Sequence, residues 1–159
     1  MDVERYAAPA DPDDLDEDYI TEVLNAVHEG LLPAIADAIE AGEVTDDLAD
    51  AHAEVYDDVD HQLEGWEYRI SGEFDGQEVA QAVEDPEPRR YRVVDVRVAS
   101  DDCLAVNVEY DDSGWYRSDD EEWVPKGVNL VRAEPSPPTN PTPWRIAELA
   151  DEAEVEWCA

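Results

Sequence analysis

Residues 90–112, RYRVVDVRVASDDCLAVNVEYDD, decide the fold class, because apolar and polar residues alternate on both sides of a short acidic turn. Alternation with period two is typical of strands that bury one face. The turn would be Ser100-Asp101-Asp102. The buried positions would be Val94, Val96 and Val98 in the first strand and Leu104, Val106, Val108 and Tyr110 in the second. The stretch therefore predicts an antiparallel pair.

The sequence around this pair predicts further strands. Trp66, Tyr68 and Ile70 alternate with polar residues, and Asp75-Gly76 is a tight-turn signal before residues 77–83, so a hairpin is expected there. Asp112-Ser113-Gly114 and Pro125-Lys126-Gly127 divide the remainder into short segments. Residues 66–133 thus predict about five antiparallel strands, arranged as a twisted sheet or a small barrel.

Residues 1–65 predict a helical hairpin behind an acidic leader. Asp14 or Asp16 can cap the first helix, and Gly42 can end it. Its apolar stripe would be Ile20, Val23, Leu24, Val27, Leu31, Ile35 and Ile39, interrupted by Gly30 and by Pro33, where a kink or a split is expected. Thr45 can cap a second helix with the stripe Leu48, His52, Val55, Val59 and Leu63.

Residues 134–159 predict an extended arm that carries a short helix. The segment EPSPPTNPTP, residues 134–143, holds five prolines and favours a polyproline-like conformation. Thr142 and Pro143 resemble a helix start, and the helix would present one amphipathic stripe. This stripe either covers its own sheet or docks on another subunit. The residues predicted to bind a partner are Trp144, Ile146, Leu149, Ala150, Ala153 and Trp157.

The expected fold class is therefore α+β. The N-terminal helical hairpin packs on the antiparallel sheet or barrel in one domain, with residues 1–65 and 66–133 as its parts and residues 134–159 as the arm.

The composition predicts a protein adapted to high salt. The chain has 44 acidic residues against ten basic ones, a net charge of −34, and only Lys126 among the basic residues is lysine. Acid excess with loss of lysine resembles the proteins of salt-in halophiles such as haloarchaea. Because the Debye length shrinks from about 10 Å at 0.1 M salt to about 3 Å at 1 M, neighbouring carboxylates repel far less in strong salt. We expect the thermal unfolding midpoint to rise with KCl concentration over this range.

The same charge opposes binding to nucleic acids and anionic lipids. The basic stretch Arg89, Arg90, Arg92 and Arg97 is expected to pair with acids on a sheet face. No apolar run is long enough for a spanning helix and no secretory signal is recognised, so membrane association is not expected, and the predicted location is the cytoplasm of a high-salt cell or a virion.

Motifs of common enzymes are not found. The chain holds no glycine-rich phosphate loop, HExxH, paired CxxC or GxSxG pattern, so no enzyme activity, cofactor or metal is predicted. His52 lies on the apolar stripe and is interpreted as a core or interface histidine and not as a metal ligand. Cys103 is interpreted as a strand residue, and it pairs with Cys158 only if the C-terminus folds back.

Three functional hypotheses are compatible with these features. The first is a structural or adaptor subunit that assembles with protein partners or with itself through the C-terminal arm, for example a head–tail connector, neck, tail or capsid accessory protein of a haloarchaeal virus. The second is a small enzyme or ligand-binding domain of NTF2-like architecture, with a pocket lined by Trp66, Tyr68, Tyr110 and Trp115. The third is an acidic mimic of DNA.

Overall fold

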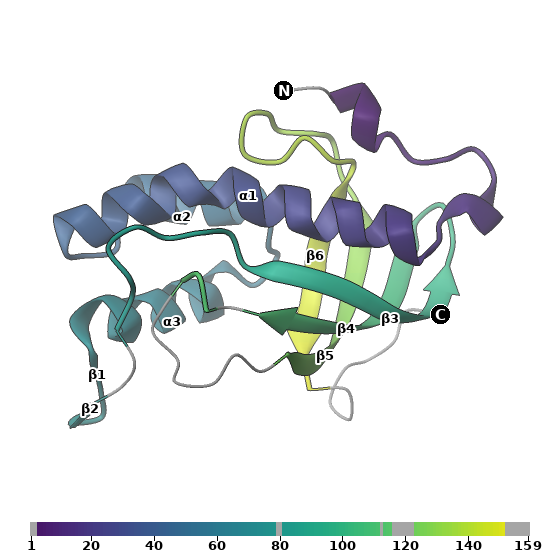
Figure 1. The fold of residues 1–159 in the computed structure, drawn as a ribbon. Coiled ribbons are helices and arrows are strands. Elements are labelled where there is room, and N and C mark those ends of the chain that lie inside the picture. The colour runs from purple at the N-terminus through teal and green to yellow at the C-terminus, as the bar shows by residue number, and fades with distance from the viewer. Residues whose placement is uncertain (1–2, 79–80, 112, 116–122, 152–159) are drawn as a thin grey trace.

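The computed structural model describes residues 3–78, 81–111, 113–115 and 123–151 (Figure 1). Two short 3-10 helices, Val3–Tyr6 and Pro12–Asp14, precede the helices α1 (Glu17–Ala41), α2 (Asp46–Ala53) and α3 (Val59–Ser71). The strands are β1 (Glu73–Phe74), β2 (Gln77–Glu78), β3 (Arg90–Ala99), β4 (Cys103–Asp111), β5 (Val124–Arg132) and β6 (Trp144–Ala150). The predicted α+β class is confirmed. None of the helices in these ranges has the length and apolarity that crossing a bilayer requires.

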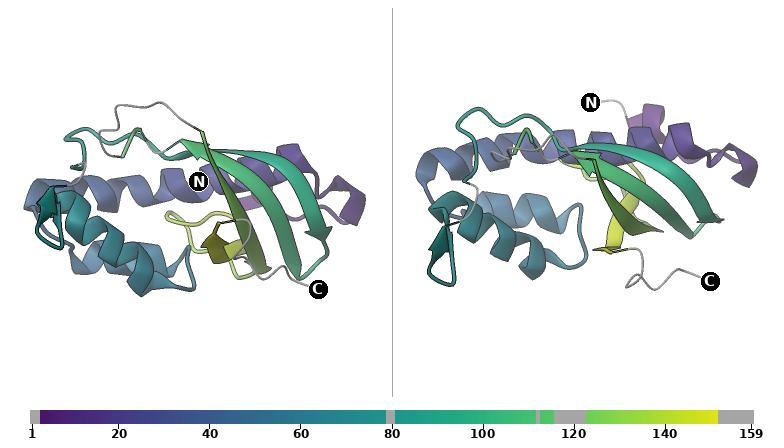
Figure 2. Two further views of the ribbon diagram at one scale, coloured as in Figure 1. Left: turned by 90° about the horizontal axis from the view of Figure 1, so that it is seen from below. Right: turned by 60° about the horizontal axis from the view of Figure 1, so that its bottom comes forward.

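The main sheet has the order β3-β4-β5-β6, and every neighbouring pair is antiparallel. It curves beside α1 and is open, so the barrel alternative is wrong (Figure 2). Four strands form it, because β1 and β2 make a separate two-stranded hairpin. The predicted turn Asp75-Gly76 joins these two short strands, and both residues have positive φ, 51° and 75°. One continuous cluster of buried side chains connects the helices to the sheet.

Helix α1 begins and ends where its sequence signals place it. The side chain of Asp16 accepts a hydrogen bond from the Tyr19 backbone N–H at 2.9 Å, and Gly42 ends the helix with a φ of 75°. Of the kink or split expected at Pro33, the split is wrong, because one helix runs from Glu17 to Ala41 with Pro33 inside it. Its apolar stripe is buried on both sides of Pro33, from Ile20 to Ile35, and this packing offsets the missing backbone donor.

Both edges of the main sheet are covered by the N-terminal half of the chain. On β3, the Tyr91 N–H donates to the side-chain oxygen of Asn25 at 2.8 Å, and the Val93 N–H donates to the Thr21 hydroxyl at 3.1 Å. On β6, Ile146 bonds to the segment between α2 and α3, with its N–H donating to the Val55 carbonyl at 2.7 Å. The two edges therefore do not meet each other to close a barrel.

Asn25→Ala should lower the free energy of unfolding by about 2 kcal/mol, because it removes the partner of both backbone groups of Tyr91 on the sheet edge. Chemical denaturation in molar KCl measures this difference. Glu22→Ala, at an exposed position of the same helix, is the matched control and should change stability by less than about 0.5 kcal/mol. Equal effects of the two substitutions would contradict the assigned role of Asn25.

The second predicted helix is two helices, and the predicted hairpin at residue 66 is wrong. Thr45 caps α2 as expected, accepting from the Leu48 N–H at 3.1 Å. The chain then leaves the helix to bond β6, and Asp58 caps α3 by accepting from the His61 N–H at 3.3 Å. Trp66, Tyr68 and Ile70 lie in α3. Trp66 and Ile70 are also one helical turn apart. A short alternation of apolar and polar residues therefore did not distinguish a strand from a helix.

The predicted pair of strands at residues 90–111 is confirmed, but the buried face of β3 differs from the prediction. Irregular register between Val93 and Asp95, and again between Val96 and Val98, changes the direction of the side chains twice. The residues of β3 opposite the buried positions of β4 are therefore Tyr91, Val93, Val96 and Ala99. Val94, predicted to be buried, is 46% exposed.

The last described part of the chain is a loop and a strand instead of an arm and a helix. Asn140 is buried in the loop, and its amide donates to the carbonyls of Glu54 and Trp144 at 2.9 and 2.8 Å. Residues 144–150 then form β6, whose pairing with β5 satisfies backbone groups that the predicted helix would have satisfied internally. Pro125-Lys126-Gly127, expected to be a turn, lies inside β5. Cys103 is disulfide-bonded.

Candidate functional site

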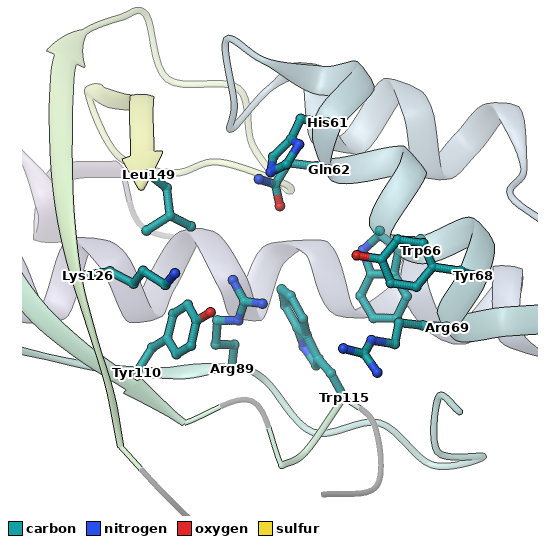
Figure 3. A pocket seen from close by; sticks show the side chains of 11 residues that line it. His61, Gln62, Trp66, Tyr68, Arg69, Arg89, Tyr110, Trp115, Lys126 and Leu149 are labelled. Atoms are coloured by element: carbon teal, nitrogen blue, oxygen red, sulfur yellow. The ribbon is translucent and has the colours of Figure 1, made fainter. Parts of the chain in front are cut away.

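A pocket of about 260 Å³ lies between α3 and the sheet (Figure 3). Helix α3 contributes one wall, strands β4, β5 and β6 contribute the other, and the segments before β3 and after β4 complete it. The lining residues are His61, Gln62, Gly65, Trp66, Tyr68, Arg69, Arg89, Tyr110, Trp115, Lys126 and Leu149. This volume is close to the lower end of ligand pockets, about 300 Å³, so it suits one small molecule.

Two loops are joined by backbone hydrogen bonds at the pocket, and this places Arg89 beside Trp115. The Glu87 N–H donates to the Gly114 carbonyl at 2.9 Å, and the Val83 N–H donates to the Trp115 carbonyl at 3.0 Å. A side chain at position 114 would collide with Glu87, because its Cβ would lie 2.8 Å from the Glu87 carbonyl oxygen. Glycine at this position is what lets the loops approach so closely.

Arg89 is the central charged group of the pocket. Its guanidinium lies between Tyr110 and Trp115, with Cζ 4.3 Å from the centroid of each ring (Figure 3). Cation–π contacts of this kind stabilise a guanidinium that has left water. The Arg89 Nη1 also donates a hydrogen bond of 3.3 Å to the Tyr91 hydroxyl. Aromatic side chains thus hold a buried cation in one orientation.

A buried hydrogen bond lies behind Tyr91 in the core. The Tyr56 hydroxyl lies 2.5 Å from His28 Nε2, and the His28 and Tyr91 rings pack together with their centroids 4.5 Å apart. His28 Nδ1 lies 2.7 Å from the Leu24 carbonyl, which can only accept, so Nδ1 carries the proton and Nε2 accepts from Tyr56. Burial, with the nearby Arg89 charge, lowers the pKa of His28 to about 3 and keeps the ring neutral.

His52 has hydrogen-bond partners on both ring nitrogens, as His28 does. Its Nδ1 donates to the Leu48 carbonyl at 2.9 Å, and its Nε2 accepts from the Trp66 indole at 3.2 Å. Burial lowers the pKa of His52 to about 4, so this ring is neutral as well. The interpretation of His52 as a core histidine is confirmed. Its bond to Trp66 orients an aromatic wall of the pocket.

The structure brings together all four aromatic residues proposed from the sequence as pocket-lining, Trp66, Tyr68, Tyr110 and Trp115. The sequence interpretation missed the cations Arg69, Arg89 and Lys126. Within the basic stretch, Arg90, Arg92 and Arg97 pair with Asp111, Glu109 and Asp95 as expected. Arg89 enters the pocket, and only its position directly before the strand distinguished it from its neighbours.

The residues predicted to bind a partner do not form one stripe in the structure. Trp144 and Ile146 are buried within this chain, Leu149 lines the pocket, and Ala150 ends β6. Ala153 and Trp157 lie outside the described residues. Their contact with another subunit stays a prediction. Among the described residues, no group of three or more His, Cys, Asp or Glu side chains is arranged to hold a metal ion.

Comparison of the chain with protein-family models, with curated protein sequences and with solved structures found no match.

Proposed function

We propose that this protein is a small-molecule-binding domain that holds its ligand between α3 and the sheet. The observation that carries the proposal is the convergence of four aromatic side chains and several polar groups on one pocket, from segments far apart in the sequence. Ligand sites combine apolar and aromatic walls with a few well-placed polar groups. Helices that back a curved sheet are also similar to the NTF2-like architecture, which is commonly used to form pockets.

Binding should raise the thermal unfolding midpoint of the protein in molar KCl. The test set is benzoate, benzamide, phenol and indole, and a ligand at about 100 times its Kd adds about 2.7 kcal/mol to the free energy of unfolding. Quenching of tryptophan fluorescence reports the same event, because Trp66 and Trp115 line the pocket. Leu149→Trp should fill the pocket and abolish both signals in a folded protein. Absence of any response across the set would contradict the proposal.

The hypothesis of a structural or adaptor subunit stays a prediction that solution mass can test. Its expected partner-binding residues lie at the C-terminal end, where β6 packs within this chain. Sedimentation in molar KCl should show a defined oligomer if the hypothesis holds. A monomer in every condition would contradict self-assembly.

A further inference from the structure

We propose that Cys103 and Cys158 form a thiol–disulfide switch. The bond closes most of the main sheet into a covalent ring, and a dithiol reductant opens it in the folded protein. This inference does not depend on ligand binding in the pocket. It is carried by the bonded state of Cys103, by the place of Cys103 in the sheet and by the number of cysteines in the chain.

The partner of Cys103 follows from the composition of the chain. Cys103 is disulfide-bonded, and the sequence contains two cysteines, Cys103 and Cys158. The bond therefore joins these two residues. Cys158 lies outside the described residues, so the cysteine count alone assigns it as the partner.

Backbone hydrogen bonds fix Cys103 at the start of β4. Its N–H donates to the Ser100 hydroxyl at 3.1 Å, and its carbonyl accepts from the Ser100 N–H at 3.0 Å. The carbonyl of the preceding Asp102 accepts from the Arg132 N–H of β5 at 3.2 Å. None of these hydrogen bonds involves the sulfur, so Cys103 keeps its place in the sheet when the disulfide opens.

The Cys103 side chain lies on the face of the sheet that points away from the core. The next residue, Leu104, packs in the core cluster, and side chains alternate between the two faces of a strand. On the Cys103 face, Ala105 is fully buried, and Asn129, which is opposite Ala105 on β5, is 5% exposed. Burial of this face beside Cys103 is expected when the segment that carries its bonded partner covers it.

The position of Cys103 gives a reductant access to the bond. Cys103 is partly exposed and follows the exposed turn residues Asp101 and Asp102, whereas residues 104–108 are buried. Thiol–disulfide exchange begins when a thiolate attacks one sulfur, so access governs its rate. A dithiol then supplies two electrons and two protons. The S–S bond breaks, two thiols form on the protein, and the dithiol closes to a cyclic disulfide.

The ring formed by the disulfide encloses three of the four strands of the main sheet. It runs from residue 103 to residue 158 and contains β4, β5 and β6. A covalent ring of this length limits the conformations of the unfolded chain and thereby favours the folded state. Reduction removes this restriction and leaves the core contacts of the strands in place. The redox state of the bond therefore controls the stability of the sheet.

The predicted cytoplasmic location favours a switch over a permanent cross-link. Thiol systems of the cytoplasm reduce accessible disulfides, and the disulfides that form there are mostly transient or redox-sensing. A bond with one end on an exposed turn is suited to such a role.

Peptide mapping tests the pairing. Trypsin cuts after Lys126, Arg132 and Arg145, all of which lie between the two cysteines. Protein that is oxidised, blocked with maleimide and digested should yield the peptides 98–117 and 146–159 as one linked species, and dithiothreitol should separate them. Absence of this species, or a covalent dimer of the chain on a non-reducing gel, overturns the pairing.

Thermal unfolding in molar KCl tests the effect on stability. Dithiothreitol should lower the unfolding midpoint of the oxidised protein by about 10 °C, and removal of the reductant with addition of oxidised glutathione should restore it. Cys158→Ser is the matched control. It should unfold at the midpoint of the reduced protein and not respond to dithiothreitol, because the next-to-last residue contributes little apart from the bond. An unchanged midpoint of the oxidised protein after reduction overturns the switch.

The rate of reduction distinguishes a switch from a buried structural bond. Maleimide labelling, followed by intact mass, counts the thiols released by millimolar dithiothreitol. Opening in the folded protein should proceed at the same rate when denaturant is added below the unfolding transition. Reduction that accelerates steeply with denaturant, or occurs only in unfolded protein, overturns the switch.

Discussion

Gly30→Ala is expected to lower the free energy of unfolding by about 3 kcal/mol, although alanine is the better helix former. A Cβ at residue 30 of α1 would lie 1.7 Å from the carbonyl oxygen of Thr139. The loop cannot move away freely, since the neighbouring Asn140 is buried and bonded to the carbonyls of Glu54 and Trp144. The substitution therefore disrupts the packing of the loop around Thr139 against α1.

Gly65→Ala is the matched control, because Gly65 is also inside a helix. The nearest atom to its added Cβ is the Tyr68 hydroxyl at 3.9 Å, an ordinary contact. Without a clash, the gain in helix propensity should raise stability by about 0.5 to 1 kcal/mol. If the loop packs on α1 as described, denaturant unfolding in molar KCl should show a lower free energy of unfolding for Gly30→Ala and a higher one for Gly65→Ala. Stabilisation by both substitutions would show that the loop does not rest on α1.

Acid should unfold the protein through its two buried histidines. His28 and His52 have pKa values of about 3 and about 4 in the folded state, against about 6.5 in the unfolded chain. Because burial lowers the folded values, the unfolded state binds more protons between these limits. Stability from these residues is therefore complete above about pH 6.5 and falls as the pH decreases toward 4 and 3. Each histidine should contribute a loss of about 2 kcal/mol between pH 7 and pH 5.

Denaturant unfolding at a series of pH values in molar KCl measures this loss while the surface carboxylates are screened. His28→Gln and His52→Gln should each flatten the dependence of stability on pH by up to about 1.4 kcal/mol per pH unit. Leu48→Ala, which removes a buried side chain without a titrating group, should lower stability equally at every pH. An unchanged pH dependence in both glutamine variants would contradict the assignment.

The candidate site shows how far the sequence could be interpreted. Its aromatic residues were predictable, because tryptophan and tyrosine stand out in a polar chain. Arg89 was not, since its neighbours Arg90 and Arg92 form the ion pairs that sheet faces commonly carry. What separates Arg89 from them is contact with Tyr110 and Trp115, which belong to a different part of the sequence. Such a contact leaves no local pattern.

By itself, the sequence determined those features that form within a few residues. The caps Asp16, Gly42 and Thr45, the turn Asp75-Gly76 and the antiparallel pair at 90–111 all follow from backbone groups bonding nearby partners. The acidic surface follows from composition alone.

Only the tertiary structure decided that residues 144–150 form a strand and which residues of β3 are buried. Both depend on contacts outside the local segment. Strand β6 pairs with β5 and bonds Val55, whereas β3 bonds Thr21 and Asn25 of α1 at its edge, and its register shifts set which of its residues face the core. The pocket has the same origin, because α3, the Arg89 segment and three strands meet only after the chain has folded. Local preference is weak compared with the burial and hydrogen bonding gained at such long-range contacts.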